Sequence, residues 1–241
     1  MKLMQKGMNK MYENGLIGVV GLGRLGRIVT ARLTGQHRLV VYDRNAELVK
    51  AIAELHGAAA AGRLTELACC NIVLLALPDK EIVTCIRELN SLKKEMLVIN
   101  MATNAPQKVV EEAAEQPLRC TSVKFVGHAG EMALGFNPVI IVNEEPADQV
   151  QAVSKLFQSI GRVVTGQADI VTEINTIAAQ KALEAGVRIE QTLQAKGYNH
   201  PAIIESAIAQ VGAGILKSYA TKDLGPFAQD IIKELKMKEE V

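Results

Sequence analysis

The feature that most constrains this chain is a glycine run near its start, Gly21–Gly26, which reads Gly-Leu-Gly-Arg-Leu-Gly. It directly follows the apolar segment Leu16–Val20 and opens a helical pattern, so it predicts a turn from a strand into a helix. In such a turn the glycines permit a tight bend, close approach of a ligand and close packing of the helix on the strand. Free N–H groups at the helix start favour a phosphate. We therefore expect the pyrophosphate of a dinucleotide to lie against Gly21, Leu22, Gly23, Arg24, Leu25 and Gly26.

An acidic and a basic residue stand side by side after the second predicted strand, Arg38–Tyr42. Asp43 lies about 20 residues beyond the glycine run, where a carboxylate accepts hydrogen bonds from the adenosine ribose and favours NAD. The neighbouring Arg44 suits a 2′-phosphate, which favours NADP, or stacking on the adenine. The two residues indicate different cofactors, so the sequence leaves NAD and NADP open.

Short β-branched runs alternate with segments of helical period from Leu16 to about Gln167. This alternation is typical of a Rossmann-type, doubly wound α/β fold, in which a mainly parallel sheet carries helices on both faces. Residues 16–167 are predicted to form a dinucleotide-binding domain, after a flexible tail over residues 1–15. The expected strands are Leu16–Val20, Arg38–Tyr42, Ala58–Ala61, Asn71–Leu77, Met96–Met101, Ser122–Val126, Val139–Val142 and Arg162–Val164.

The architecture changes after Gln167, because the following residues read as helices alone. The expected stretches are Ile170–Lys196, Pro201–Ala220 and Pro226–Lys236. The second carries an apolar stripe together with Gly212–Gly214, small residues that let another helix approach. Such stripes must be buried, and a second subunit is one candidate partner. We expect residues 168–241 to form a helical domain that makes a homodimer.

Composition argues against several other kinds of partner. Basic residues (27) and acidic residues (26) nearly balance, which gives no electrostatic reason to expect nucleic acid or a membrane surface. The four cysteines lack disulfide or zinc-finger spacing, and no group of metal-binding residues has ligand spacing, so no metal is expected. Apolar runs are shorter than the roughly 20 residues of a membrane-spanning helix. A reducing cytoplasm is the simplest compartment for this chain.

From Leu16 onward the chain resembles the reductases that join a Rossmann unit to a helical dimerisation domain. The chain resembles pyrroline-5-carboxylate reductases in particular, with 3-hydroxyisobutyrate, 6-phosphogluconate and prephenate dehydrogenases as relatives. Besides the glycine run, the segments that carry this resemblance are Val73–Pro78, Val98–Thr103, Phe125–Glu131 and Gly197–Pro201. The resemblance implies NAD or NADP as cofactor, and contacts to it from Leu77, Pro78, Met101 and Thr103.

The chain departs from pyrroline-5-carboxylate reductases in the parts that bind substrate there. Ala179–Ala185 replaces their Ser-Gly-Ser-Gly-Pro-Ala-Tyr run, and Gly225–Asp230 stands near the place of their Ser-Pro-Gly-Gly-Thr-Thr loop. The resemblance therefore extends to the cofactor and the assembly, and it does not extend to proline synthesis.

Lys181 is one candidate for acid/base chemistry. On a helical projection it shares a face with Ile170, Ile174 and Ile177, and a charge in an apolar stripe costs free energy unless it is paired. In hydroxyacid dehydrogenases that this chain resembles, a lysine on the corresponding helix is the general acid/base, although an asparagine follows one turn later where this chain has Ala185. The alternative is a structural lysine that extends into solvent or pairs across a dimer.

His128 is a second candidate, at the carboxyl edge of the predicted sheet, where open α/β folds bind ligands. It can exchange a proton with a substrate oxygen, or it can be a loop histidine bonded to backbone. Thr103 and Asn104 can contact nicotinamide or substrate, whereas Asn104 can equally cap a helix. His200, just before Pro201, reads as a helix-cap residue.

Together these features predict an NAD(P)-dependent oxidoreductase that transfers hydride between nicotinamide and a small imine, keto acid or hydroxy acid. The alternative is a non-catalytic nucleotide-binding protein that senses redox state or serves as a scaffold. The divergent substrate motifs and the incomplete lysine and asparagine pair favour that alternative.

Overall fold

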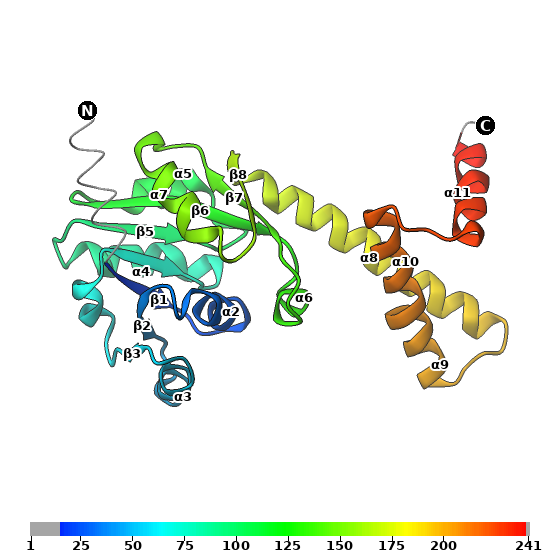
Figure 1. Ribbon diagram of the computed structural model, residues 1–241, viewed down its shortest axis with the longest axis horizontal. Coiled ribbons are helices and arrows are strands. Elements are labelled where there is room, and N and C mark those ends of the chain that lie inside the picture. The colour runs from blue at the N-terminus through cyan, green and yellow to red at the C-terminus, as the bar shows by residue number, and fades with distance from the viewer. Residues whose placement is uncertain (1–14, 240–241) are drawn as a thin grey trace. The chain divides into compact units, whose positions relative to one another are not determined.

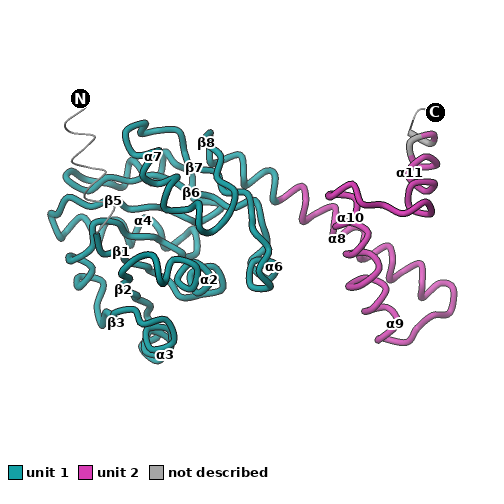
Figure 2. Tube along the Cα trace, in the orientation of Figure 1, with its two compact units in different colours: residues 1–175 teal, residues 176–241 magenta. Residues whose placement is uncertain are grey.

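The computed structural model describes residues 15–239, which divide into two compact units after Asn175 (Figure 2). The tail expected over residues 1–15 thus lies outside the described residues except for Gly15. The first unit holds the sheet and the second is helical. The division falls inside a helix rather than at Gln167, because the first turns of that helix are bonded to the first unit.

Eight strands within residues 15–239 form one sheet (Figure 1). They are β1 (Leu16–Val20), β2 (Arg38–Tyr42), β3 (Ala59–Ala60), β4 (Ile72–Leu75), β5 (Met96–Asn100), β6 (Leu118–Val126), β7 (Val139–Asn143) and β8 (Arg162–Gly166). Their order is β3-β2-β1-β4-β5-β6-β7-β8, and the pairs from β3 to β6 are all parallel. The sheet reverses at β7, which runs antiparallel to β6, and β8 is parallel to β7.

Helices cover both faces of this sheet, as a doubly wound fold requires. Those of the first unit are α2 (Arg24–Leu33), α3 (Ala46–His56), the 3₁₀ turn η1 (Leu64–Cys69), α4 (Asp79–Asn90), α5 (Gln107–Ala113), α6 (Ala129–Ala133) and α7 (Ala147–Phe157). Apolar residues of α2, α3 and α7 pack against one set of strand residues, and those of η1, α4 and α5 pack against the alternate set. The predicted Rossmann-type α/β fold is therefore confirmed.

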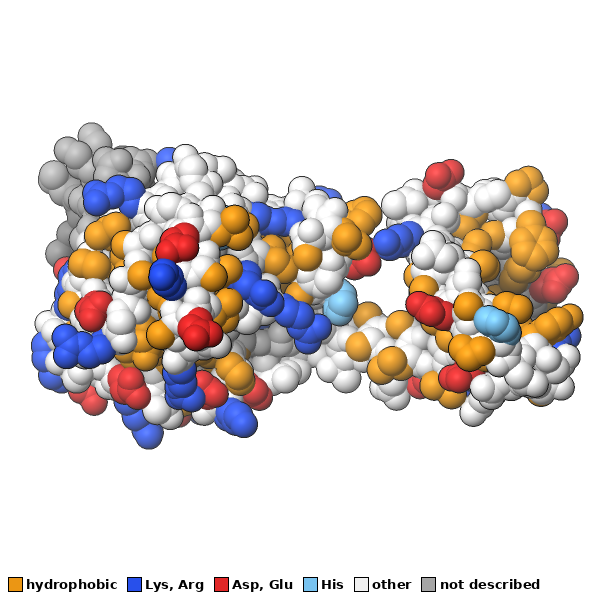
Figure 3. All heavy atoms as spheres, turned by 90° about the horizontal axis from the view of Figure 1, so that it is seen from below, with side chains coloured by type: hydrophobic (Ala, Val, Ile, Leu, Met, Phe, Trp, Pro, Cys, Tyr) orange, Lys and Arg blue, Asp and Glu red, His pale blue; other side chains and the backbone are white. Residues whose placement is uncertain are grey.

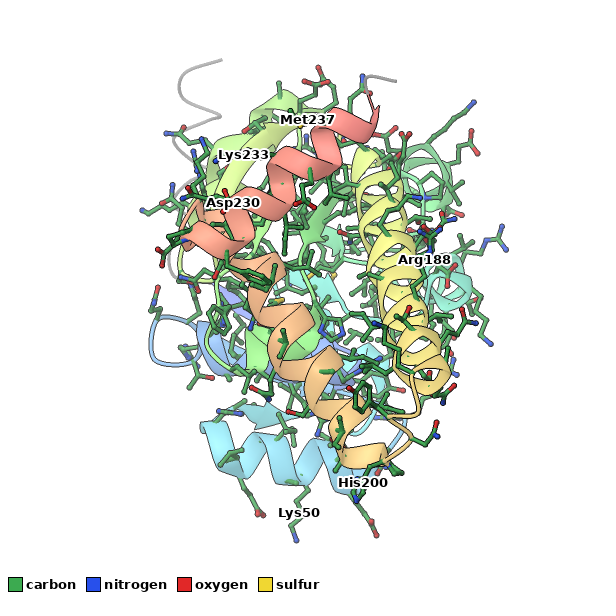
Figure 4. The ribbon with its side chains drawn as sticks, turned by 90° about the vertical axis from the view of Figure 1, so that its right-hand side faces the viewer. Lys50, Arg188, His200, Asp230, Lys233 and Met237 are labelled. Atoms are coloured by element: carbon green, nitrogen blue, oxygen red, sulfur yellow. The ribbon has the colours of Figure 1, made fainter. Side chains whose placement is uncertain are left out.

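The second unit consists of helices that leave much apolar surface exposed. It contains the end of α8 (Ile170–Ala195), then α9 (Pro201–Ser206), the π-helical turn η2 (Ala207–Gly212), α10 (Ala213–Thr221) and α11 (Pro226–Glu239). His200 caps α9, because its Nδ1 accepts a hydrogen bond from the Ala202 amide at 3.3 Å (Figure 4). Hydrophobic side chains spread over the surface of this unit in Figure 3.

A close helix crossing at a glycine supports the expected role of the Gly212–Gly214 segment. A Cβ at Gly212 would lie 3.3 Å from the Ile189 side chain of α8, tighter than ordinary contact. Gly214, by contrast, has open space around it. The helical stretch expected over Pro201–Ala220 is confirmed as α9, η2 and α10, which follow one another without a break, and η2 adds a π-helical turn that the sequence did not predict. The widened turn ends at Gly212, beside α8.

Candidate functional site

The glycine run forms the predicted turn between β1 and α2. Gly21 has φ +88°, a left-handed conformation that side chains rarely adopt, and its amide donates to the Tyr42 carbonyl at 2.9 Å. A Cβ at Gly26 would lie 1.8 Å from the Gly21 oxygen, so only glycine fits there. No side chain in residues 15–239 caps the start of α2 at Gly23, where the backbone is exposed. The backbone N–H groups in the first turn of α2 are therefore available to bind an anion.

Asp43 links the end of β2 to the glycine turn. One carboxylate oxygen accepts the Leu22 amide hydrogen at 2.7 Å, and the other accepts that of Asn45 at 2.9 Å. A carboxylate offers about four acceptor sites, so acceptor capacity remains for ribose hydroxyls. The acid that the sequence spacing singled out is thus held beside the turn by hydrogen bonds within the chain.

A cavity of about 370 Å³ lies where β1, β2 and β4 end. Five of the predicted cofactor residues line it, namely Gly21, Asp43, Arg44, Leu77 and Pro78. Helix α4 supplies four further lining residues that sequence reasoning missed, Glu81, Thr84, Cys85 and Glu88. Their only sequence signal is their spacing after Pro78 along α4.

The other predicted cofactor residues lie outside this cavity. Arg24 lines a separate hollow of about 510 Å³ between α2 and α6, and Leu25 packs against the core. Met101 is almost fully buried, with 2% of its surface exposed. Thr103 is half-buried beyond the end of β5, and its carbonyl accepts the Thr172 hydroxyl hydrogen at 2.6 Å.

His128 is exposed and directly precedes α6, just past the carboxyl end of β6. Its ring packs over Gly130, since a Cβ there would lie 2.9 Å from His128 Cε1. Helix α6 was missed in the sequence because it is a single short turn. Arg32 of α2 holds this segment, because its guanidinium donates to the carbonyls of Met132 at 2.7 Å and Phe136 at 3.0 Å.

Lys181 belongs to the second unit. Its side chain is 71% exposed, and its ammonium bonds the Glu184 carboxylate at 2.9 Å one turn along the helix. That hydrogen bond lowers the pKa of Glu184. Ile177, a member of the expected stripe, is also exposed. Within one chain Lys181 therefore meets water and Glu184.

An ion pair between a buried lysine and a half-exposed aspartate just before α8 was not anticipated. Lys124 of β6 is 1% exposed, and its ammonium donates to Asp169 at 2.6 Å. The same carboxylate accepts the Gln107 amide hydrogen at 3.0 Å and so caps α5. The expectation that Asn104 caps this helix is wrong, because Pro106 holds the cap position and Asp169 supplies the acceptor. A lysine inside a strand that is covered on both faces is the sequence signal for such a pair.

Two further hydrogen bonds fix the first turns of α8 to the carboxyl edge of the sheet. The Thr172 hydroxyl donates to the Thr103 carbonyl, which lies just past β5. The side-chain amide of Asn175 donates to the Phe125 carbonyl of β6 at 2.9 Å. The chain thus leaves the first unit at the edge where the glycine turn and His128 also lie.

The cysteines take part in none of these contacts and are free thiols. Burial raises the pKa of Cys70, Cys85 and Cys120 to about 12, so these thiols remain protonated. In the described part of the chain, no group of three or more His, Cys, Asp and Glu residues is arranged to hold a metal ion. Nor does any helix there have the length and apolarity to cross a membrane.

A glycine turn, an acid at the end of β2 and a cavity between them define a dinucleotide-binding protein of Rossmann type. The chain belongs to the family of the NAD-binding domain of 6-phosphogluconate dehydrogenase, whose model matches residues 16–169. Its cofactor is accordingly NAD or NADP, as the sequence predicted, and the predicted resemblance to NAD(P)-binding reductases is confirmed. A sequence search of curated proteins finds no match.

Solved structures share this fold at low sequence identity. A pyrroline carboxylate reductase from Plasmodium falciparum with NADP bound has a TM-score of 0.62 and 16% identity, covering 92% of this chain and 84% of its own. An imine reductase variant from Myxococcus stipitatus in complex with NAD+ has a TM-score of 0.62 and 13% identity, and the match covers 87% of this chain and 78% of its own. A Mycobacterium tuberculosis 3-hydroxyisobutyrate dehydrogenase with L-serine has a TM-score of 0.64 and 15% identity, and the match covers 83% of this chain and 72% of its own.

Proposed function

We propose that this protein is an NAD(P)-dependent oxidoreductase that transfers hydride between the nicotinamide and a small imine, keto acid or hydroxy acid. The observation that carries the proposal is the hydrogen bond of 2.7 Å between Asp43 and Leu22 of the glycine turn, beside a cavity that both Gly21 and Asp43 line. The substrate classes come from the proteins of the same fold, which reduce imines or pyrroline carboxylate or oxidise a hydroxy acid according to their names.

The chain's own residues have separate tasks in this proposal. The bound nicotinamide supplies the site that accepts or donates hydride. Gly21–Gly26 hold the pyrophosphate and Asp43 holds the adenosine ribose. Thr103 and His128, which lie past the ends of β5 and β6, are assigned to the substrate, and the exposed His128 imidazole exchanges the proton with the substrate oxygen or nitrogen. Lys181 is the second proposed acid/base group.

Replacing His128 or Lys181 by alanine tests these assignments. We expect turnover of an accepted substrate to fall roughly 100-fold in a variant that lacks the proton-transfer group, because general acid/base catalysis contributes at least this much. Binding of NADH or NADPH should persist, and since the chain has no tryptophan, nucleotide fluorescence reports it directly. Rates are measured with panels of small cyclic imines, keto acids and hydroxy acids.

Matched controls are available for both residues. His200 is an exposed cap histidine, and Lys233 forms an exposed pair with Asp230 at the same sequence spacing as Lys181 with Glu184 (Figure 4). The H200A and K233A variants should turn over at the wild-type rate. Unchanged turnover in H128A and K181A would remove both assignments. Failure of the wild-type protein to bind either nucleotide would overturn the function itself.

The second candidate is a nucleotide-binding protein without catalysis, such as a redox sensor or scaffold. It is favoured by the surroundings of the two acid/base candidates, since His128 is exposed and Lys181 has an ordinary ion pair with Glu184. Tight NADH binding with no turnover across all three substrate panels would support this candidate over the first.

We further propose that the second unit pairs with a second copy of the chain to form a homodimer. Its large hydrophobic residues are mostly exposed, as shown by Leu183 at 70%, Val211 at 64% and Phe227 at 78%. Large apolar side chains left exposed in such number favour a surface that a partner covers. Isologous pairing of two copies is the commonest way to bury it.

The L183D variant tests the dimer. Leu183 lines a hollow on α8 with Val187 and Ala179, so a carboxylate there would be buried by a partner. We expect wild type to be dimeric at micromolar concentration and L183D to be monomeric, as measured by light scattering. L55D is the control, because Leu55 on α3 is equally exposed, at 73%, and belongs to the first unit. A monomeric wild-type protein would refute the proposal.

A further inference from the structure

The charges that line the cavity at the ends of β1, β2 and β4 are unbalanced. Its described lining carries the carboxylates of Asp43, Glu81 and Glu88 against one guanidinium, that of Arg44. Arg44 follows Asp43 directly, and both glutamates come from α4. The cavity is therefore net negative.

The one guanidinium in this lining is already engaged. Arg44 Nη1 lies 3.3 Å from Glu81 Oε2, with 74% of the arginine side chain and 27% of the glutamate side chain exposed. Burial raises the pKa of the Cys85 thiol in the same lining, Glu88 and Glu81 raise it further, and Arg44 lowers it. Glu81 lies in the first turn of α4, so this ion pair joins α4 to the residue that follows Asp43.

NAD and NADP differ in this part of the site by a 2′-phosphate on the adenosine ribose. Such a phosphate carries a charge of about −1.5 to −2 and needs a cation with free donors. Beside Asp43 it would meet a like charge, whereas a 2′-hydroxyl would meet an acceptor. Arg44 is the residue in the lining that can reverse this preference, provided that its guanidinium is released.

We infer that Glu81 is a specificity-determining residue, which holds Arg44 away from a 2′-phosphate and so makes the site select NAD(H) over NADP(H). The inference rests on the proposed dinucleotide function of this cavity. In the sequence, Asp43 favours NAD and Arg44 favours NADP. The ion pair with Glu81 removes this conflict, because it occupies the guanidinium that a 2′-phosphate would need.

Dissociation constants of NADH and NADPH, measured by nucleotide fluorescence in wild type and in E81Q, test the inference. We expect wild type to bind NADH at least roughly tenfold more tightly than NADPH, because of the like charges around Asp43. In E81Q the ratio of the two constants should move toward NADPH by roughly three- to tenfold, since one exposed ion pair is released. E88Q is the matched control, as it removes a carboxylate from the same helix and cavity but leaves the pair of Arg44 with Glu81 in place.

The possible outcomes distinguish the role of Glu81 from the proposed dinucleotide binding. In the double variant R44A/E81Q the gain in NADPH affinity should disappear, because the released guanidinium is absent. A wild-type preference for NADPH, an unchanged ratio in E81Q or an equal shift in E88Q would overturn the role of Glu81 while leaving the dinucleotide site intact. Binding of neither nucleotide to wild type would overturn both.

Discussion

Replacing Gly26 by alanine is expected to abolish NADH binding and to lower the free energy of unfolding by at least roughly 3 kcal/mol, at the upper end for overpacking. The added Cβ would lie 1.8 Å from the Gly21 oxygen and 2.9 Å from the Gly21 carbonyl carbon. These are backbone atoms of the turn, which Asp43 and Tyr42 hold by hydrogen bonds, so they cannot move aside cheaply. Urea denaturation followed by circular dichroism and a nucleotide titration measure the two effects.

Gly23 provides the control for this experiment. A Cβ built on Gly23 meets nothing within 4 Å, so the G23A variant should unfold at nearly the wild-type urea concentration. It should still bind NADH much more weakly, because the methyl group occupies the space that a pyrophosphate needs at the start of α2. Equal stability of G26A and wild type, or full NADH affinity in G23A, would contradict this account of the turn.

Replacing Asp169 by alanine is expected to destabilise the first unit by about 3 kcal/mol, since it leaves Lys124 buried without a partner. Lys124 is only 1% exposed, and the same carboxylate caps α5 at Gln107. The 44% exposure of Asp169 places the cost at the low end for a buried pair. Chemical denaturation gives the free energy, and hydrogen exchange at the start of α5 reports the lost cap.

Asp148 is the matched control for Asp169. It is similarly exposed, at 41%, and pairs with Arg119 at 2.7 Å, but that arginine is 26% exposed and keeps access to water. D148A should therefore cost about 1 kcal/mol or less. The K124M variant should be less destabilised than D169A, because methionine fills the site without a charge. If D169A and D148A lost the same free energy of unfolding, the burial of Lys124 would not be what determines the loss in D169A.

Local sequence was sufficient for the parts of the fold whose residues are neighbours in the chain. The bounds of β1 and β2 were predicted correctly because each is a short apolar run that ends at a turn or a charge. The turn at Gly21 and the acid at Asp43 follow from a fixed spacing, and the structure brings them together. Here periodicity and turn chemistry decide the conformation.

Contacts between distant segments could not be derived in the same way. β6 begins at Leu118 rather than Ser122, because its first residues pair with β5 although they are poor in β-branched residues. Pairing of Asp169 with Lys124 joins residues that are far apart in the sequence. Glu81 likewise becomes relevant only when the first turn of α4 lies beside Arg44. Such pairs depend on the tertiary arrangement, which no local pattern encodes.

The length of β6 gives the carboxyl edge of the sheet two unlike ends. Asn100, the last residue of β5, pairs with Ser122, whereas β6 continues to Val126 alongside β7. Arg32 ties the following connection, residues 127–138, to α2. This edge of the sheet thus has a cavity over the ends of β1, β2 and β4, whereas beyond the end of β5 the longer strand β6 continues past it. Insertions or deletions in residues 127–138 would alter the room beyond the end of β5 while every register of the parallel strands stayed the same. Changes of length in this connection are therefore expected to leave the cavity at the ends of β1, β2 and β4 as it is.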